Sequence, residues 1–170
     1  METLVVLTIT VVLLTLGIPS MREIIERNVV AGHVSGFLGA VSLARAEAIK
    51  RGITVVMCRS TDAETATTPT CSTATDWQAG WIVFSDRNGN LAIDSASGDV
   101  LLRAQGVVTS SGGISQNSAS VLTFRSTGLM GAGATQFTFE PASGSTAQRR
   151  RVCMTLQGRT HVTTEGSATC

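Results

Sequence analysis

The chain has 170 residues, with 13 Lys and Arg against 12 Asp and Glu, so its formal net charge is only +1. A nearly neutral chain is not, as a whole, an electrostatic attractor for nucleic acid. Aromatic residues make up 4% of the chain, with no Tyr, and the length leaves room for an N-terminal segment and one domain of about 120 residues.

An apolar run from Leu4 to Ile18 opens the chain, between Glu2 and Pro19. It is shorter than the roughly 20 residues of a spanning helix, and no small-residue cleavage site follows it. The chain continues directly into a pattern of apolar residues at helical spacing, which ends in two cations and a glycine at 50–52. We therefore expect one helix over Thr3–Arg51, about 73 Å long, with its first half in lipid or in a helix bundle.

Two features of this helix bear on its packing. The residues Gly17-Ile18-Pro19 predict a kink near the membrane face. Farther on, small residues gather at positions 31, 32, 36, 39 and 40. Such residues let helices approach closely, so this patch contacts either a neighbouring helix or the sheet of its own domain.

Strand patterns fill the rest of the chain. The dipeptide Asn88-Gly89 is a strong hairpin signal, Gly112-Gly113 predicts a turn, and residues 59–76 read as a polar loop. One helix followed only by strands predicts an antiparallel α+β domain, with a transmembrane or filament-core helix over 1–27 and a globular domain over 28–170. The strands are expected at 53–57, 80–85, 91–93, 99–104, 106–109, 120–125, 135–139, 152–156 and 160–163.

Four cysteines follow the apolar helix: Cys58, Cys71, Cys153 and Cys170. Their spacing does not fit a zinc site, and an even number behind a membrane anchor indicates two disulfides in an oxidising compartment. Three pairings are open, and proximity in the sequence favours Cys58–Cys71 and Cys153–Cys170. By closing a loop, each of these disulfides would stabilise the folded state by about 3 kcal/mol. The alternative is reduced cysteines in the core.

The last 25 residues are basic, with a net charge of +3, whereas residues 58–145 carry −3. Arg149, Arg150 and Arg151 precede one predicted strand, and Arg159 and His161 follow it. Guanidinium groups on a hairpin can contact phosphates without reading sequence, so these residues are candidates for DNA binding. The other interpretation is a solvated strand face. Strand alternation would place Arg149 and Arg151 on one face and Arg150 on the other.

No catalytic motif is present: the chain lacks GxSxG, a P-loop, HExxH and a GxGxxG after a strand. The segment Asp86 to Asn90 resembles part of a calcium loop, but Leu91 and Ser97 stand where that loop needs Gly and Glu. A turn in which Asp86 accepts hydrogen bonds from local backbone is the better interpretation. We therefore expect no enzyme, no metal and no cofactor.

Taken together, these residues resemble the type IV pilin-like minor pilins and pseudopilins of the FimT/GspH family. The resemblance covers essentially the whole chain. It rests on Glu2 to Val6 opening the apolar helix, Pro19 at the expected kink, and Ala44 to Ala48 before a glycine and a strand ending in Cys58. Its most specific part is Trp77 to Asp86 followed by Asn88-Gly89; a Gly-Arg between the last two strands and the final Cys170 also fit.

The resemblance implies a non-enzymatic subunit of a type IV pilus or a type II secretion pseudopilus. It would be a single-pass protein of the bacterial inner membrane with a periplasmic domain, and it is associated with methylation. By position alone Glu2 is an ordinary acid at the membrane surface, but the family's acid pairs with the N-terminal amine of a neighbouring subunit. The implied partners are other minor and major pilins and an inner-membrane assembly platform, driven by a cytoplasmic ATPase.

Two departures from the family pattern matter. The family's precursors carry a short basic leader ending in Gly before the Glu, whereas Met1 directly precedes Glu2. We therefore expect either a start farther upstream or a truncated chain. Members linked to DNA uptake in natural transformation carry a Gly-Arg-x-Arg motif that binds DNA. Here it reads Gly158-Arg159-Thr160-His161, and His is mostly neutral at pH 7, which weakens this alternative function.

Overall fold

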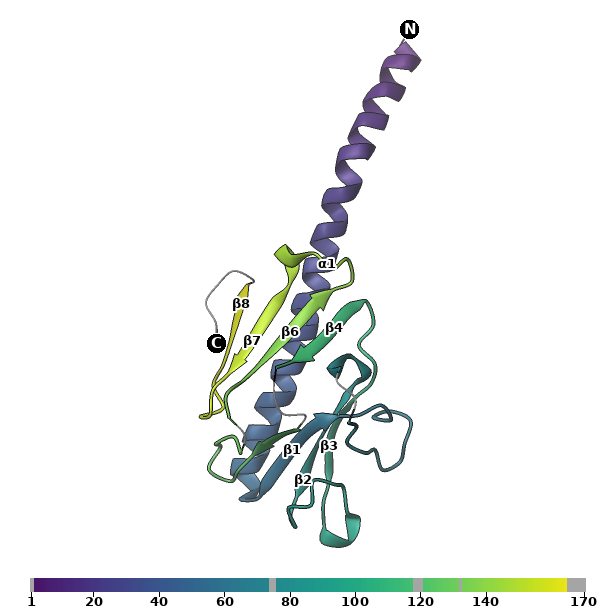
Figure 1. Cartoon of the computed structure of the whole chain (residues 1–170). Coiled ribbons are helices and arrows are strands. Elements are labelled where there is room, and N and C mark those ends of the chain that lie inside the picture. Colours follow the sequence, from purple (N-terminus) through teal and green to yellow (C-terminus); the bar gives the residue numbers. More distant parts are fainter. Residues whose placement is uncertain (1, 74–75, 118–120, 132, 165–170) are drawn as a thin grey trace.

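One long helix and two antiparallel sheets make up the fold (Figure 1). The computed structural model describes the backbone of residues 2–73, 76–117, 121–131 and 133–164, and the side chains of these residues apart from 11–20. The helix, α1, spans Glu2–Arg51. The strands are β1 Thr54–Arg59, β2 Trp81–Asp86, β3 Leu101–Gln105, β4 Ser111–Gln116, β5 Val121–Phe124, β6 Thr135–Pro141, β7 Arg150–Met154 and β8 Thr160–Thr164.

The two sheets have the strand orders β3-β2-β1-β5 and β4-β6-β7-β8, and every pairing is antiparallel. The second half of α1 lies against both sheets, with its main contacts to β1 and β6. The predicted α+β class is therefore confirmed.

Helix α1 runs without interruption from Glu2 to Arg51, close to its predicted bounds, and Figure 1 shows no sharp bend at the expected kink over 17–19. Its C-terminus is capped as expected. The Gly52 N–H donates to Ala48 O at 3.0 Å, and the φ of Gly52 is +68°. Only a residue without a Cβ adopts this left-handed conformation at no steric cost.

The first half of α1 extends away from the domain (Figure 1). Its apolar side chains from Leu4 to Ile9 are each more than half exposed. By length and composition, Met21–Arg51 also passes as a membrane span, with a mean hydropathy of 1.3. However, a third of its most apolar stretch is buried within the domain, so we assign this half to the domain core. The part of α1 before it, which is exposed over the described side chains of residues 2–10, is the better candidate for a membrane segment.

The core is aromatic and centred on α1. Phe37, which is fully buried, lies between Trp77 and Trp81 from the first sheet's side and Phe137 and Phe139 from β6. The Trp77 Nε1–H donates to a side-chain oxygen of the second sheet, 2.9 Å away on β4. The two sheets thus share one core, and the helix fills the space between them.

The small-residue patch on α1 has a divided environment. Ala40 is fully buried, as expected for packing against the sheets. A Cβ added to Gly32 or Gly36 would meet nothing within 4 Å, and at Gly39 it would meet only the Arg103 side chain, at 3.7 Å. Gly32 and Gly36 instead line a pocket of about 200 Å³ with Trp81 of β2 and Gln105 of β3, so they face their own domain without close packing.

The predicted hairpin at Asn88-Gly89 is wrong, because β2 ends at Asp86 and its partner strand is β3 rather than residues 91–93. In the loop between β2 and β3, carboxylates accept the hydrogen bonds that a partner strand would otherwise accept from the backbone. Asp86 accepts from Gly89 N and Leu91 N at 2.7 and 3.1 Å, as expected of a local turn. Asp99 accepts in the same way from two other backbone N–H groups of the loop. The described residues contain no cluster suited to a metal.

Two further predictions fail in the next segment. Residues 106–109 form no strand, although the Val108 N–H donates to Gln78 O at 2.9 Å. Gly112 and Gly113, expected as a turn, lie inside β4. The register of β4 against β6 shifts between Ser111 and Gly113, and the φ of Gly113 is +126°. The glycines therefore serve a β-bulge, which the dipeptide alone does not distinguish from a turn.

The first predicted disulfide is present. Cys58 at the end of β1 is bonded to Cys71, with Cα atoms 5.6 Å apart. Cys153 is also disulfide-bonded, and its expected partner Cys170 lies outside the described residues. The Cys58–Cys71 bond closes a polar loop that is organised by Asp62. This carboxylate accepts from Ser60 Oγ at 2.6 Å and from Thr70 N and Oγ1 at 3.0 and 3.1 Å.

This loop predicts a pH dependence of stability. The hydrogen bonds from Ser60 and then Thr70 hold the pKa of Asp62 below its usual value. A depressed carboxyl pKa contributes stability that is complete above the ordinary value of about 3.9 and is lost as pH falls through the folded-state pKa. Asp62→Ala should lower the free energy of unfolding by about 1 kcal/mol at pH 7 and by less at pH 3. The loss at pH 7 is limited because the carboxylate is partly exposed.

Urea unfolding at the two pH values measures this difference. The variant Glu64→Ala, at an exposed position of the same loop, is the matched control and should change stability little at either pH. An equal loss for Asp62→Ala at pH 7 and pH 3 would show that the charge of Asp62 does not stabilise the loop.

Candidate functional site

The three consecutive arginines of the basic tail are largely engaged within the domain. Arg149 Nε donates to Glu140 Oε2 at 2.6 Å, across to β6. Arg150 Nη1 donates to the backbone oxygens of Ala147 and Arg149 at 3.2 and 2.9 Å. Arg151 is half-buried, and its Nε is enclosed without a hydrogen-bond partner. Strand β7 begins only at Arg150, so the predicted alternation does not extend to Arg149.

Arg159 has a different setting. It is exposed on the turn between β7 and β8, which was predicted at 157–159. Within this turn, Gly158 N donates to Thr155 O at 2.8 Å and Thr155 N donates to Arg159 O at 3.0 Å. His161 follows on β8, the edge strand of its sheet, and is also exposed. Of the five predicted cationic residues, these two are therefore the accessible ones.

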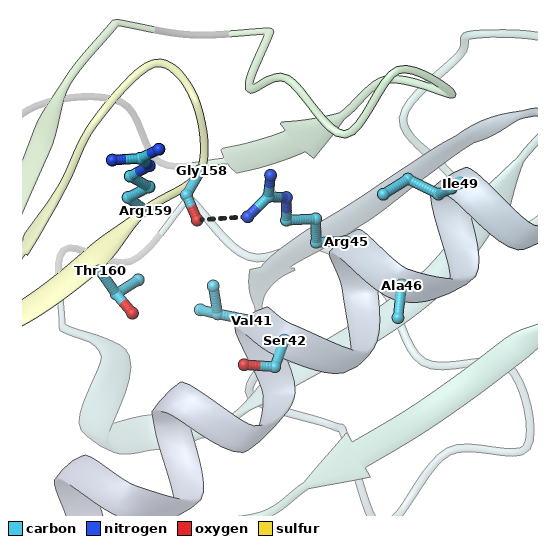
Figure 2. A pocket seen from close by; sticks show the side chains of 8 residues that line it. All are labelled: Val41, Ser42, Arg45, Ala46, Ile49, Gly158, Arg159 and Thr160. Carbon is cyan, nitrogen blue, oxygen red and sulfur yellow. Dashed lines mark hydrogen bonds between the residues drawn. The ribbon is translucent and has the colours of Figure 1, made fainter.

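Arg159 lines a surface groove of about 540 Å³ between this turn and the second half of α1 (Figure 2). A second guanidinium lies in the same groove. It belongs to Arg45 of α1, whose Nη1 donates to Gly158 O at 3.4 Å, while its Nε is buried without a partner. The remaining lining is aliphatic or hydroxylic, from Val41, Ser42, Ala46, Ile49 and Thr160.

Two glycine turns fit closely over Arg45. Gly128 and Gly158 have φ values of +78° and +70°. A Cβ on Gly158 would lie 3.2 Å from Gly128 O and 3.3 Å from the Arg45 Cδ and Nε atoms. A Cβ on Gly128 would lie 2.8 Å from Ile49 Cδ1. Both positions therefore need glycine for conformation and for space, and together they hold Arg45 against the groove.

The groove is cationic. Two of its lining residues are arginines and none is acidic. The nearby helix acid, Glu47, instead accepts from Arg51 Nε and from Lys50 Nζ, the latter at 3.3 Å. The hydrogen bond from Arg51, followed by that from Lys50, lowers the pKa of Glu47, so it is ionised and already paired at neutral pH. The chemistry available to the groove is therefore binding of an anionic group beside an apolar floor.

Sequence reasoning missed Arg45 as a site residue. The sequence pattern shows it only as one cation of the polar face of a helix. The available signal was the pair Ser42 and Ala48, three positions away on either side, since small neighbours at this spacing leave a long cation room to lie along the helix surface. Arg45 lies near Arg159, 114 positions later, only because β7 and β8 pack beside α1, and no local sequence pattern predicts this packing.

The predicted assembly residues lie at the other end of the molecule. Glu2 begins α1 and is exposed, together with the apolar side chains that follow it. The backbone of Pro19 is helical, and its side chain lies outside the described part of the chain. The structure thus separates two regions: an exposed apolar helix that begins with an acid, and a cationic groove near the far end of the same helix.

Comparisons with known proteins agree with this architecture. Residues 33–158 match the family described as Type II transport protein GspH. A crystal structure of the type IV minor pilin FimU from Pseudomonas aeruginosa is similar with a TM-score of 0.62 at 17% identity, covering 81% of this chain and 90% of that one. A second crystal form of FimU gives a TM-score of 0.51 at 18% identity, covering 72% and 83%.

A sequence comparison with curated proteins finds no match. The low identity to FimU establishes the fold alone, whereas the family match covers well over half of the chain. The chain therefore belongs to the GspH family and has the type IV pilin-like fold.

Proposed function

We propose that the protein is a minor pilin or pseudopilin, a structural subunit of a type IV pilus or a type II secretion pseudopilus. The observation that carries this proposal is the apolar half-helix, which extends away from a domain that already has a complete core. Such a surface is stable only in lipid or against other helices. A filament subunit needs both environments, the first before assembly and the second after it.

In this proposal, residues 1–27 form the membrane and filament-core segment and residues 28–170 form a periplasmic domain. Two observations support a boundary there. Among the side chains that the structure describes, Val30 is the first from the N-terminus in the buried core, and Glu26 accepts hydrogen bonds from Ser143 N and Oγ of the domain at 2.6 and 2.7 Å. Other pilins and an inner-membrane assembly platform would be the partners, and the disulfides suit the oxidising periplasm.

Replacing Glu2 should prevent assembly without affecting the fold. A carboxylate in a filament core is costly unless it has a partner, for which we propose the N-terminal amine of the neighbouring subunit. Glu2→Ala should lower the amount of the protein in sheared filaments at least tenfold, while its amount in the membrane stays unchanged. Quantitative immunoblotting of both fractions in the native host measures this effect.

Thr8→Ala is the matched control, because Thr8 is an exposed polar residue of the same half-helix whose hydroxyl donates only within the helix. It should assemble normally. Full incorporation of Glu2→Ala would contradict the role proposed for Glu2. If the wild-type protein is absent from filaments, and its deletion changes neither piliation nor protein secretion, the filament function itself is wrong.

A second candidate function is DNA binding during natural transformation. The observation that favours it is the exposed Arg159 beside Arg45, with His161 close by in the sequence. Because Arg149 and Arg150 are bonded within the domain, Arg159→Ala should weaken binding of duplex DNA more than Arg149→Ala does. Salt-dependent gel-shift titrations of the full chain in detergent measure this difference. Absence of a shift at low salt removes the candidate.

A further inference from the structure

The groove at Arg45 and Arg159 is bordered by exposed aliphatic side chains from three segments. Ile49 of α1 is 53% exposed, Leu129 is 45% exposed, and Leu156 is 51% exposed. The segments that carry them are in contact. Met130 N donates to Leu156 O at 2.9 Å, and Gly128 is packed against Ile49. This end of the domain therefore combines exposed aliphatic side chains with a cationic groove.

Such a composition suits a protein partner better than DNA. Interfaces with nucleic acid are polar and strongly positive, whereas the centre of a protein interface combines aliphatic or aromatic side chains with arginine. The complementary surface needs an exposed aliphatic side chain next to a free carboxylate. The remaining question is which segment offers both.

The neck of α1, which we define as residues 21–27, has this combination. Met21, Ile24 and Ile25 are 60%, 52% and 56% exposed, and Glu23 is exposed beside them. The exposed aliphatic residues Leu91 and Val100 are less suitable. Near Leu91 and Val100, the neighbouring acids Asp86, Asp94 and Asp99 accept hydrogen bonds from their own loop. The neck also carries Arg22 and Arg27, so its recognition depends on the position of Glu23 rather than on net charge.

Helix geometry separates two faces of the neck. Ile25 and Glu26 line a small pocket against the loops at Ser110 and Ser143 of their own domain. Glu23 and Ile24 are not part of that pocket lining. They are therefore available for contact with another molecule.

We propose that the groove binds the neck of a second copy of this chain, with Glu23 between Arg45 and Arg159 and Ile24 on the exposed aliphatic residues. The proposal rests on the filament function proposed above and specifies one of its contacts. The two surfaces lie 22 residues apart on one helix, which corresponds to about 33 Å. Because the two surfaces differ, the contact is heterologous and adds copies in one direction, each displaced by about this distance if the helices run parallel.

The same displacement has a second consequence. It brings position 10 of the second copy to the level of Gly32 and position 14 to the level of Gly36. Gly32 and Gly36 line a pocket of about 200 Å³ with Trp81 of β2, and a Cβ at either glycine would meet nothing within 4 Å, so this pocket has space for a side chain of the second copy. Two copies anchored at the same depth in one membrane cannot adopt this displacement. The contact should therefore form in detergent or in the filament, and not between copies in vesicles.

Site-specific crosslinking of the full chain tests this contact. With p-benzoylphenylalanine in place of Ile24, irradiation in detergent should give a dimer whose adduct maps to residues 46–50, 126–131 or 152–159. Arg159→Glu and Glu23→Arg should each lower the dimer yield at least fivefold, and their combination should restore at least half of it. Arg87→Glu, an exposed charge reversal in another loop, should leave the yield unchanged.

The proposal is overturned if the adduct maps elsewhere or if neither charge reversal lowers the yield. If the wild-type protein shifts duplex DNA in a gel, and Arg159→Glu loses this shift but still forms the crosslinked dimer, the groove binds nucleic acid instead. Failure of this contact is distinguishable from failure of the filament function. In the first case the protein still enters sheared filaments of the native host, and in the second case it does not.

Discussion

Replacing Phe37 with alanine is expected to destabilise the protein by about 3–5 kcal/mol, as large-to-small substitutions of buried aromatic residues generally do. The side chain is fully buried, and its ring centroid lies 4.6 Å from that of Phe137. Edge-on contacts to Trp77, Trp81 and Phe139, at 5.5–5.7 Å, complete the cluster. No neighbouring side chain can fill the cavity without leaving this arrangement, because helix and both sheets meet at this residue.

Urea unfolding followed by tryptophan fluorescence measures this loss, since both tryptophans contact the substituted ring. Phe37→Leu keeps most of the volume and should cost clearly less than the alanine variant. Val107→Ala, at a side chain that is 64% exposed, is the control and should change stability by no more than about 0.5 kcal/mol. A loss below about 1 kcal/mol for Phe37→Ala would show that the sheets do not depend on the helix for their core.

The elements that sequence reasoning predicted well are those specified by local pattern. The C-terminus of α1 follows from cations and a glycine, and its observed end at Arg51 is the predicted one. Strand β6, predicted at 135–139, alternates between buried and half-buried residues over Thr135–Pro141. In both cases the periodicity records which side chains meet the core, so a single segment carries enough information.

The failures are those in which a distant group decides the local structure. Gly112-Gly113 has the composition of a turn, but β6 pairs with this segment and makes it a bulged strand. Asn88-Gly89 has the composition of a hairpin, but the carboxylate of Asp99 accepts hydrogen bonds from the backbone N–H groups of Arg87 and Asp94, on either side of this dipeptide. Turn composition indicates that the chain changes direction there. It does not indicate which groups form hydrogen bonds with the backbone N–H and C=O groups of the segment.

The candidate site shows the same limit. Arg159 was predicted from a short motif, and its turn formed as expected. Arg149 was predicted equally from composition, yet it is bonded to Glu140 on the neighbouring strand. Arg45 was not predicted, because its proximity to the turn at Gly158 follows only from the packing of β7 and β8 beside the helix. Charge counts therefore identify candidate cations, and tertiary contacts decide which are free to bind a partner.

Asp76 illustrates how one carboxylate joins the two sheets, and Asp76→Ala should cost about 3 kcal/mol. Its Oδ1 accepts from Gln78 N and from Ile114 N of β4, both at 2.8 Å. Its charge also faces Arg59, which is only 7% exposed and has a guanidinium carbon 6.0 Å from the Trp77 ring centroid. The variant leaves two backbone donors without an acceptor and a buried cation without its compensating charge.

The pKa of Arg59 separates these two causes. Burial lowers this pKa and the charge of Asp76 partly raises it, so the Arg59 charge depends on Asp76 for compensation. Asp76→Asn keeps an acceptor oxygen but removes the charge, and it should cost about half as much as Asp76→Ala. Arg59→Met combined with Asp76→Ala removes the uncompensated cation, and this double variant should be more stable than Asp76→Ala alone.

A double-mutant cycle of urea unfolding free energies measures the coupling between the two residues. If the double variant is no more stable than Asp76→Ala, the charge of Arg59 does not contribute and the loss comes from the two backbone donors. If Asp76→Asn is as stable as the wild type, hydrogen bonding alone joins the sheets at this point. Either result identifies which property of Asp76 holds the second sheet in place beside the helix, and with it the turn between β7 and β8 that borders the groove.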